Sequence, residues 1–157
     1  MQYFETFPKL LYDAEGNGNY KVITDILRRF KARKSITDQV VLFDKYSVKD
    51  GEKPEDVSHK FYGTTSYHWV VLSINNISDR YYGWPLSNID FENYIADKYT
   101  NPDATHHHEI AQSSGKTSSL DNSHLITVNS DVSGASAVSN RTYEDRINEN
   151  KRLIKIL

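Results

Sequence analysis

The chain has 157 residues, a length that suits one domain or one small domain with appended arms. Its 19 basic and 21 acidic residues give a formal net charge of -2, so bulk charge does not favour nucleic-acid binding. The chain contains no cysteine, which excludes disulfides, thiolate metal sites and a cysteine nucleophile.

The N-terminal part is predicted to be an aromatic arm, a polar loop and a helix. Residues 1–8 are too short to fold alone, and the aromatic anchors of this arm are Tyr3, Phe4 and Phe7. Residues 13–19 (DAEGNGN) are typical of a turn or flexible loop. Further on, four apolar residues have the spacing of one helix face: Ile23, Ile26, Leu27 and Phe30. Thr24 is a candidate cap for this helix.

The middle of the chain is predicted to contain the folded core. Residues 40–48 are β-branched and aromatic, which is typical of a strand. A helix is expected to follow the turn at residues 50–54, because Pro54 fits its first position and Gly63 fits the position after its end. The side chains assigned to the core are Val57, Phe61 and Trp69.

A second helix and an aromatic segment come next. The helix is expected over residues 66–75, with Thr64 or Thr65 as its cap and Asn75 in the left-handed conformation at its end. Residues 79–85 (DRYYGWP) are interrupted by glycine and proline and are predicted to be extended or irregular. This segment is also where a second strand is expected. Its aromatic residues either contact a partner or pack into the core: Tyr81, Tyr82 and Trp84.

The C-terminal part begins with a helix and becomes polar. A helix is predicted over residues 87–99, with Ser87 in the capping position. Residues 106–110 and 124–129 are candidates for the two strands of a polar hairpin, which would be marginal on its own. Residues 130–140 are predicted to be a loop.

The chain ends with a helix and an apolar tail. The helix is predicted over residues 142–152, with Thr142 as its cap. Residues 154–157 are expected to pair as an edge strand, on this chain or on another subunit. Deletion of residues 152–157 is expected to leave the core folded but to impair docking on a partner.

Several clusters in this order resemble one protein family. They are Tyr62-Gly63, YHWVVL from Tyr67, Asn75-Asn76, Asp79, YYGW from Tyr81 and the ending NENKRLIKIL. Together they resemble the baseplate wedge protein family of contractile-tailed phages. Residues 46–52 with Pro54, Val57, Phe61 and Asn75 also resemble the LysM module, a βααβ unit, and the wedge family is known for a LysM-like domain.

The resemblance implies an α+β fold in three parts. Residues 1–39 would be an N-terminal arm and helix, residues 40–86 a LysM-like βααβ core, and residues 87–157 a helix, a polar hairpin and a docking tail. The implied function is that of a structural virion protein that clamps neighbouring wedges together and to the inner baseplate. It would reside in the virion tail baseplate, and in the host cytoplasm during assembly.

The implied partners are other wedge subunits and inner-baseplate or hub subunits. The expected partner-binding residues are Tyr3, Phe4, Phe7, Tyr81, Tyr82, Trp84, Ile154, Ile156 and Leu157. The alternative is a LysM-type module that binds peptidoglycan or N-acetylglucosamine polymers, with its groove formed by residues 49–54 and 75–79. A single copy without a secretion signal favours protein contacts over glycan binding.

No catalytic site, cofactor or small-molecule substrate is predicted. The chain has no Gly-x-Ser-x-Gly motif, and its serines concentrate in polar segments that could not preorganise a nucleophile. His106, His107, His108 and Glu109 form a metal-like cluster, but a closed zinc site needs more ligands, so no metal is assigned. No apolar run approaches the roughly 20 residues of a membrane span, and the N-terminus lacks a signal-peptide pattern. The chain is expected to start in the cytosol and to have no membrane partner.

Overall fold

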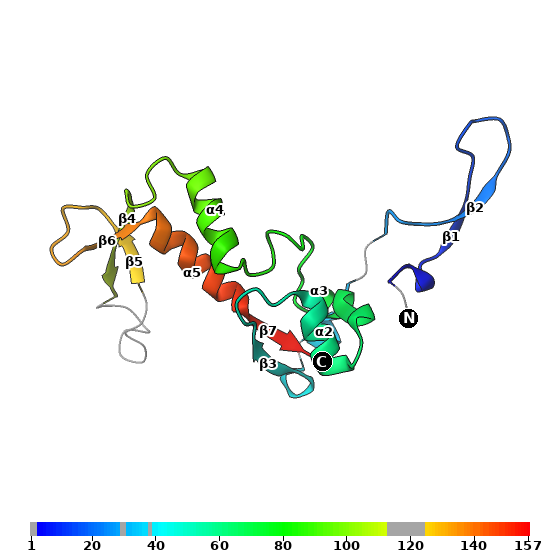
Figure 1. The fold of residues 1–157 in the computed structure, drawn as a ribbon, viewed down its shortest axis with the longest axis horizontal. Helices are drawn as coiled ribbons and strands as arrows, with labels where there is room; N and C mark the ends of the chain where they lie inside the picture. Colours follow the sequence, from blue (N-terminus) through cyan, green and yellow to red (C-terminus); the bar gives the residue numbers. More distant parts are fainter. Residues whose placement is uncertain (1–2, 29–30, 38, 113–124) are drawn as a thin grey trace. The chain divides into compact units, whose positions relative to one another are not determined.

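The computed structural model describes residues 3–28, 31–37, 39–112 and 125–157 (Figure 1). The chain divides into two compact units. Met1–Pro85 and Lys151–Leu157 form the first, called the outer unit here, and Leu86–Asn150 form the second, called the inserted unit. Both contain helices and strands, so the fold is α+β, as the sequence predicts. The tail, which the sequence grouped with residues 87–157, belongs to the outer unit.

The outer unit begins with a short 3-10 helix and a β-hairpin. Helix η1 spans Tyr3–Thr6, and strands β1 (Lys9–Tyr12) and β2 (Lys21–Thr24) pair antiparallel. The helix predicted from Ile23 onward is therefore wrong where the structure describes it, and Phe30 lies outside the described residues. The apolar spacing fits a helix, but the β-branched residues of β2 favour a strand once β1 is available to pair with it.

Two short helices lead into the core. They are α1 (Lys34–Thr37) and the 3-10 helix η2 (Val40–Leu42). The strand predicted over residues 40–48 is shorter in the structure, where β3 spans Asp44–Ser47. Helices α2 (Pro54–Tyr62), η3 (Thr65–Tyr67) and α3 (His68–Ile74) follow.

The partner of β3 comes from the other end of the outer unit. Strand β7 (Leu153–Ile156) pairs antiparallel with β3, from Asp44 opposite Ile156 to Ser47 opposite Leu153 (Figure 1). The second strand expected near residues 81–84 is therefore wrong. That segment is a turn, because Asp79, Gly83 and Pro85 favour tight turns over an extended ladder.

Local start and stop signals in the outer unit are mostly as predicted. Pro54 occupies the first turn of α2, and Gly63 ends that helix with a φ of 70°. The Thr64 hydroxyl accepts a hydrogen bond from Ser66 N at 3.3 Å, which caps η3. The left-handed residue after α3 is Asn76, with a φ of 55°, and not Asn75.

Six buried side chains form the core of the outer unit: Val48, Val57, Val71, Trp84, Ile154 and Ile156. Trp84 Nε1 donates to the Glu52 carbonyl at 2.8 Å, so burial leaves no unsatisfied indole N–H. The assignment of Phe61 to this core is wrong, because its side chain is 41% exposed and its ring stands 5.0 Å from the Tyr46 ring. Trp69 is half-buried.

Strand β7 is held on its second edge by an amide side chain. Asn75 Oδ1 accepts from Lys155 N at 2.7 Å, and Asn75 Nδ2 donates to the Lys155 carbonyl at 2.8 Å. On the side of β3, Val48 N donates to the Arg152 carbonyl at 2.8 Å. The tail is therefore an integral strand of the core, so the structure predicts that its deletion unfolds the core, contrary to the expectation from the sequence.

The inserted unit consists of helices α4 (Asn88–Lys98) and α5 (Asn140–Arg152, which runs on into β7) and a three-stranded antiparallel sheet. The strand order is β5 (Leu125–Val128), β4 (Thr105–Ala111) and β6 (Ser136–Ser139). The predicted hairpin is confirmed as β4 and β5, except that His124 lies outside the described residues. Strand β6 lies in the predicted loop, so that prediction is wrong there.

Two caps start the helices of the inserted unit. The Ser87 hydroxyl accepts from Asp90 N at 3.2 Å, as the sequence predicts. Helix α5 begins before the predicted Thr142, because Ser139 Oγ accepts from Thr142 N at 3.2 Å. No helix in the described part of the chain is long and apolar enough to cross a membrane.

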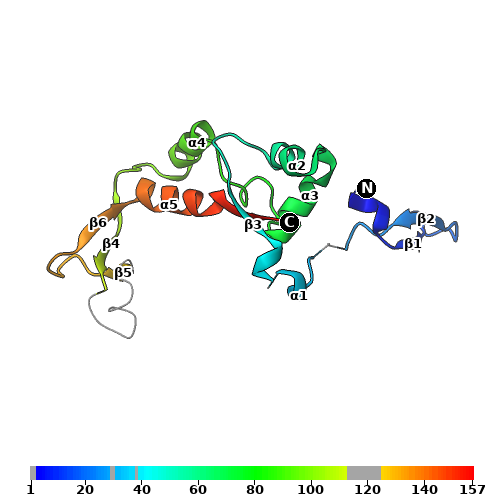
Figure 2. The ribbon, with the colours of Figure 1, turned by 90° about the horizontal axis from the view of Figure 1, so that it is seen from below.

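A buried carboxylate joins α4 to α5, which lie side by side (Figure 2). Glu144 accepts from Lys98 Nζ at 2.7 Å, Tyr99 Oη at 2.8 Å and Tyr94 Oη at 3.4 Å. Burial raises the pKa of Glu144, but the bonds from Lys98 and Tyr99 outweigh burial and hold the pKa below its usual value. One turn later on α5, Asn148 binds the N–H and carbonyl of Leu86 at 2.8 and 3.2 Å.

Deletion of residues 153–157 should abolish the cooperative unfolding of the outer unit. The deletion removes Ile154 and Ile156, and losing the side chain of one buried isoleucine costs about 2–5 kcal/mol, out of about 5–15 kcal/mol for a whole domain. Both tryptophans of the chain lie in the outer unit, so thermal unfolding followed by tryptophan fluorescence reports on that unit alone. Lys155→Ala, an exposed change in the same strand, is the control. A deletion variant with the wild-type midpoint would contradict this role of β7.

Glu144→Gln should destabilise the inserted unit by about 1–3 kcal/mol, because the neutral amide leaves Lys98 and two tyrosines imperfectly paired. Since the pKa of Glu144 is lowered in the folded state, this stability is present above the ordinary glutamate pKa and is lost as pH falls through the lowered value. Urea unfolding monitored by hydrogen exchange of α4 and α5 measures it at pH 7 and in acid. Glu92→Gln, in the exposed pair with Arg141, should change stability by less than about 0.5 kcal/mol. Equal effects of the two substitutions would refute the assignment.

Candidate partner-binding surfaces

The aromatic residues of the N-terminal arm pack together. The Tyr3 ring centroid lies 4.9 Å from that of Phe4, 4.9 Å from that of Phe7 and 5.6 Å from that of Trp69. Tyr3 and Phe7 are partly covered in this arrangement, whereas Phe4 is exposed. Of the three predicted anchors, Phe4 therefore presents the most surface to a partner.

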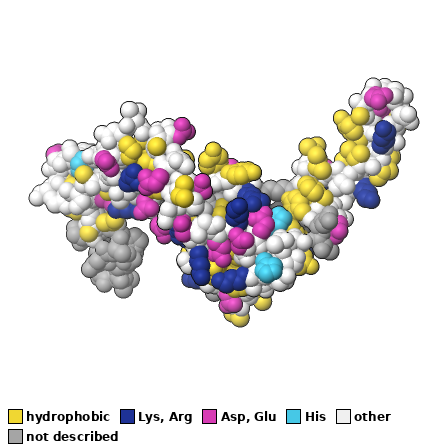
Figure 3. All heavy atoms as spheres, in the orientation of Figure 1, with side chains coloured by type: hydrophobic (Ala, Val, Ile, Leu, Met, Phe, Trp, Pro, Cys, Tyr) yellow, Lys and Arg dark blue, Asp and Glu magenta, His cyan; other side chains and the backbone are white. Residues whose placement is uncertain are grey.

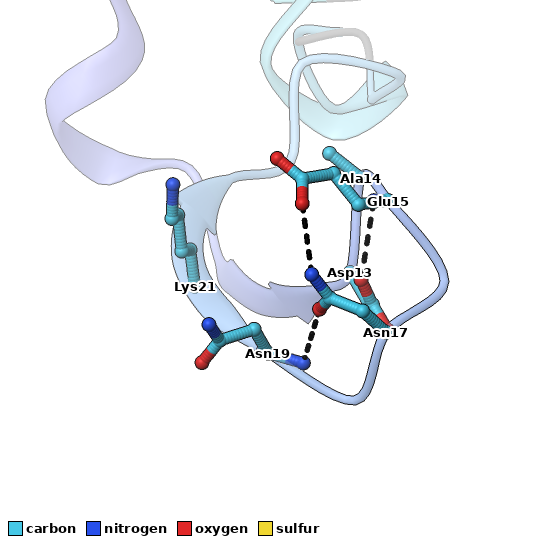
Figure 4. Close-up of a pocket in the computed structure, with 6 residues that line it drawn as sticks. All are labelled: Asp13, Ala14, Glu15, Asn17, Asn19 and Lys21. Atoms are coloured by element: carbon cyan, nitrogen blue, oxygen red, sulfur yellow. Dashed lines mark hydrogen bonds between the residues drawn. The ribbon is translucent and has the colours of Figure 1, made fainter.

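The loop between β1 and β2 is organised by one carboxylate. Asp13 accepts from the backbone N–H groups of Gly18 at 2.7 Å, Gly16 at 2.8 Å and Glu15 at 3.2 Å. The bond from Gly18 has the largest effect, and together these bonds lower the pKa of Asp13. The loop encloses a small polar pocket lined by Asp13, Ala14, Glu15, Asn17, Asn19 and Lys21 (Figure 4). Asn17 links Glu15 to the backbone of Asn19 in this pocket.

The two strands of this hairpin expose large apolar side chains. The space-filling view shows hydrophobic side chains on the surface of the arm (Figure 3). Leu11, Tyr12, Val22 and Ile23 are all exposed. The sequence pattern does not reveal this surface, because residues 23–30 have the apolar spacing of a helix and residues 9–12 carry no clear strand signal. The alternation of apolar and polar residues along β1 is weak, so only the pairing reveals it.

The aromatic segment after α3 separates into exposed and buried residues. Asp79 Oδ1 accepts from Tyr81 N at 2.8 Å and Tyr82 N at 3.2 Å, and Gly83 N donates to the Asp79 carbonyl at 2.8 Å. A Cβ at Gly83 would lie 2.5 Å from the Asp79 carbonyl oxygen, so the turn requires glycine. Tyr81 and Tyr82 are 78% and 66% exposed, whereas Trp84 is in the core.

Of the predicted C-terminal anchors, two are buried and one is exposed. Ile154 and Ile156 are buried in the core of their own chain, since alternate residues of β7 point into it. Leu157 is exposed, and its N–H donates to the Tyr62 hydroxyl at 3.4 Å. In this structure only Leu157 of the three offers apolar surface to a partner.

The histidine cluster joins β4 to α5. A register shift between Thr105 and His107 interrupts the alternation of side chains along β4 at the histidines. The His106 ring stacks on the Tyr143 ring at 4.0 Å, and its Nδ1 lies 2.8 Å from His107 Nδ1. His107 Nε2 lies 2.8 Å from Glu109 Oε1.

Arg146 completes this cluster from α5. It donates to both Glu109 oxygens at 2.8 and 2.7 Å, and this contact, followed by that of His107, lowers the pKa of Glu109. Within the described ranges, no group of three or more His, Asp or Glu side chains is placed to hold a metal ion. The cluster therefore links a sheet to a helix and shows no ligand geometry.

The comparisons with known proteins identify one family. A model of the family described as base plate wedge protein 53 matches residues 2–119. The baseplate wedge protein gp53 of Enterobacteria phage T4 is 32% identical over 65 residues, which are 41% of this chain and 33% of that relative. The chain thus spans about a third of the length of this relative. Since the family model covers most of the sequence, this chain belongs to the base plate wedge protein 53 family.

Proposed function

We propose that this chain is a structural protein of the baseplate wedge of a contractile phage tail. Its role is to clamp neighbouring wedges together and to tie them to the inner baseplate. The observation that carries the proposal is the family match over residues 2–119. The partners are other wedge subunits and inner-baseplate subunits, and the protein works in the virion tail after assembly in the host cytoplasm.

The distribution of exposed anchors supports a clamp. Phe4, the Tyr81-Tyr82 pair and Leu157 each expose an apolar or aromatic side chain, and they come from three separate segments of the outer unit. Aromatic residues on a rigid turn lose little conformational entropy on binding, and such residues dominate many interfaces. Several modest contacts in one chain also give high avidity when their partners are held in one assembly.

The outer unit also offers the arrangement that a LysM-like module would need. Strand β3, helices α2 and α3, and strand β7 follow in the order strand, helix, helix, strand, and the two strands pair antiparallel. The sequence places the alternative glycan groove at residues 49–54 and 75–79. Within this region Glu52 accepts from Tyr46 and Lys49, and Asn75 binds Lys155, so polar groups that could bind a sugar already have partners. This occupancy favours protein contacts over peptidoglycan binding.

Substitution of both Tyr81 and Tyr82 by alanine should reduce incorporation into phage particles by about tenfold or more when the variant competes with wild type. Both side chains are exposed, so the melting temperature of the outer unit should stay unchanged. Quantitative mass spectrometry of purified particles measures the ratio of variant to wild type. Val41→Ala is the matched control, because Val41 is 97% exposed and belongs to none of the predicted anchors.

One result would contradict the proposal, and another would contradict only the tyrosine anchor. If the wild-type chain is absent from purified particles and binds isolated peptidoglycan in sedimentation assays, the glycan-binding alternative replaces it. If the chain is present and the double variant competes equally with wild type, the tyrosine pair is not an anchor, and cryo-electron microscopy of the particles would show the contacts elsewhere.

A further inference from the structure

The β1–β2 hairpin has apolar side chains on both faces. Its register places Leu11 opposite Val22 on one face, and Leu10 opposite Ile23 on the other. Leu11 is 66% exposed and Val22 is 65% exposed. A two-stranded hairpin is marginally stable in water on its own, so these faces are suited to burial against another surface.

Both edges of the hairpin are available for strand pairing. Asp25 N donates to the Pro8 carbonyl at 2.9 Å, one step beyond the pair of Lys9 and Thr24. Because hydrogen-bonded and non-bonded pairs alternate in an antiparallel ladder, the N–H and carbonyl groups of Leu11 and Val22 point away from the opposite strand. In the described ranges β1 and β2 form a sheet of two strands only, so these groups face outward.

The charge of the hairpin restricts the kind of partner. Lys9 and Lys21 balance Asp13 and Glu15, so the hairpin carries no excess positive charge for phosphate or anionic lipid. Asp13 and Glu15 lie in the loop at its tip, and insertion of this tip into a bilayer would bury carboxylates at high cost. A protein surface that offers apolar side chains and backbone hydrogen bonds fits both the faces and the edges.

We propose that the β1–β2 hairpin docks on an exposed β-strand of a neighbouring baseplate protein. The partner strand extends the sheet at the open edge of β2, where the Val22 N–H points outward, and apolar side chains of the same partner cover the faces. This inference rests on the proposed function, since that function makes the neighbour a baseplate protein. It adds a contact surface, residues 9–24, that the predicted anchors do not include.

Site-specific photo-cross-linking in assembled particles tests the contact directly. Benzoylphenylalanine replaces Leu11 or Val22, and mass spectrometry identifies the adduct. Both positions are expected to cross-link to the same baseplate protein, within one strand of it. The control places the same group at Val41, which is 97% exposed and lies outside the hairpin, and this position should not give that adduct.

Two variants separate side-chain from backbone contributions. Val22→Asp places a charge on the apolar face, and Val22→Pro removes an outward N–H that the proposed partner strand uses. Each should lower competitive incorporation into particles by about tenfold or more, whereas Val41→Asp should not. Because Val22 is exposed, the melting temperature of the outer core should remain at the wild-type value in all three.

Each contrary result has a separate meaning. Wild-type incorporation of both Val22 variants would overturn the docking proposal while leaving the proposed function standing. Absence of the wild-type chain from particles would overturn the proposed function itself. Self-association in analytical ultracentrifugation that Val22→Asp abolishes would assign the hairpin to a second copy of this chain. Binding to neutral or anionic vesicles that the same variant abolishes would assign it to a membrane, and both results would overturn the proposal.

Discussion

The pairing of β3 with β7 is the contact on which the outer unit depends. It joins segments that are distant in the sequence. Val48 and Arg152, which lie next to the paired strands, are 104 residues apart. Ile154 and Ile156 supply the apolar surface that covers Val57 and Val71 from the side of the strands. A chain with few apolar residues therefore builds a core by bringing β3 and the C-terminal strand β7 together.

In both units, polar side chains hold distant backbone segments together. Asn75 in the outer unit and Asn148 in the inserted unit each bind the N–H and the carbonyl of one backbone residue. An amide side chain suits this task because it offers one acceptor and two donors close together. Glu144 has a similar role between helices, where three donors satisfy its buried carboxylate. Small cores thus gain fixed geometry from satisfied polar groups rather than from added apolar volume.

The sequence predicts what is local and misses what is distant. Pro54, Gly63 and Ser87 mark helix ends correctly, because a cap depends on neighbouring residues only. The partner of β3 could not be read, since the Ile-Lys-Ile alternation of β7 indicates a strand without indicating its neighbour. Ile23 begins an apolar spacing that fits a helix, but it also lies among the β-branched residues of β2, and pairing of Lys21–Thr24 with Lys9–Tyr12 decides for the strand.

Prediction of the candidate anchors is limited in the same way, because burial depends on distant contacts. Tyr82 and Trp84 are separated by one glycine, and composition gives no reason to place one outside and the other inside. The turn held by Asp79 makes this division, together with the acceptor that the Glu52 carbonyl offers to the Trp84 indole. The exposed surface of the hairpin could not be predicted, because residues from Ile23 onward have helical spacing. A helix there gives no strand register that would place Leu11 beside Val22.

The late position of β7 in the chain also orders events on the ribosome. All of Leu86–Asn150 must be synthesised before the strand that completes the outer core exists. The strand pairings of the inserted unit lie within its own residues. This unit can therefore fold before β7 is available to pack on β3, α2 and α3. A product that terminates early therefore keeps Val57, Val71 and Trp84 accessible to proteases and chaperones. Completion of the core of the outer unit therefore depends on the synthesis of β7.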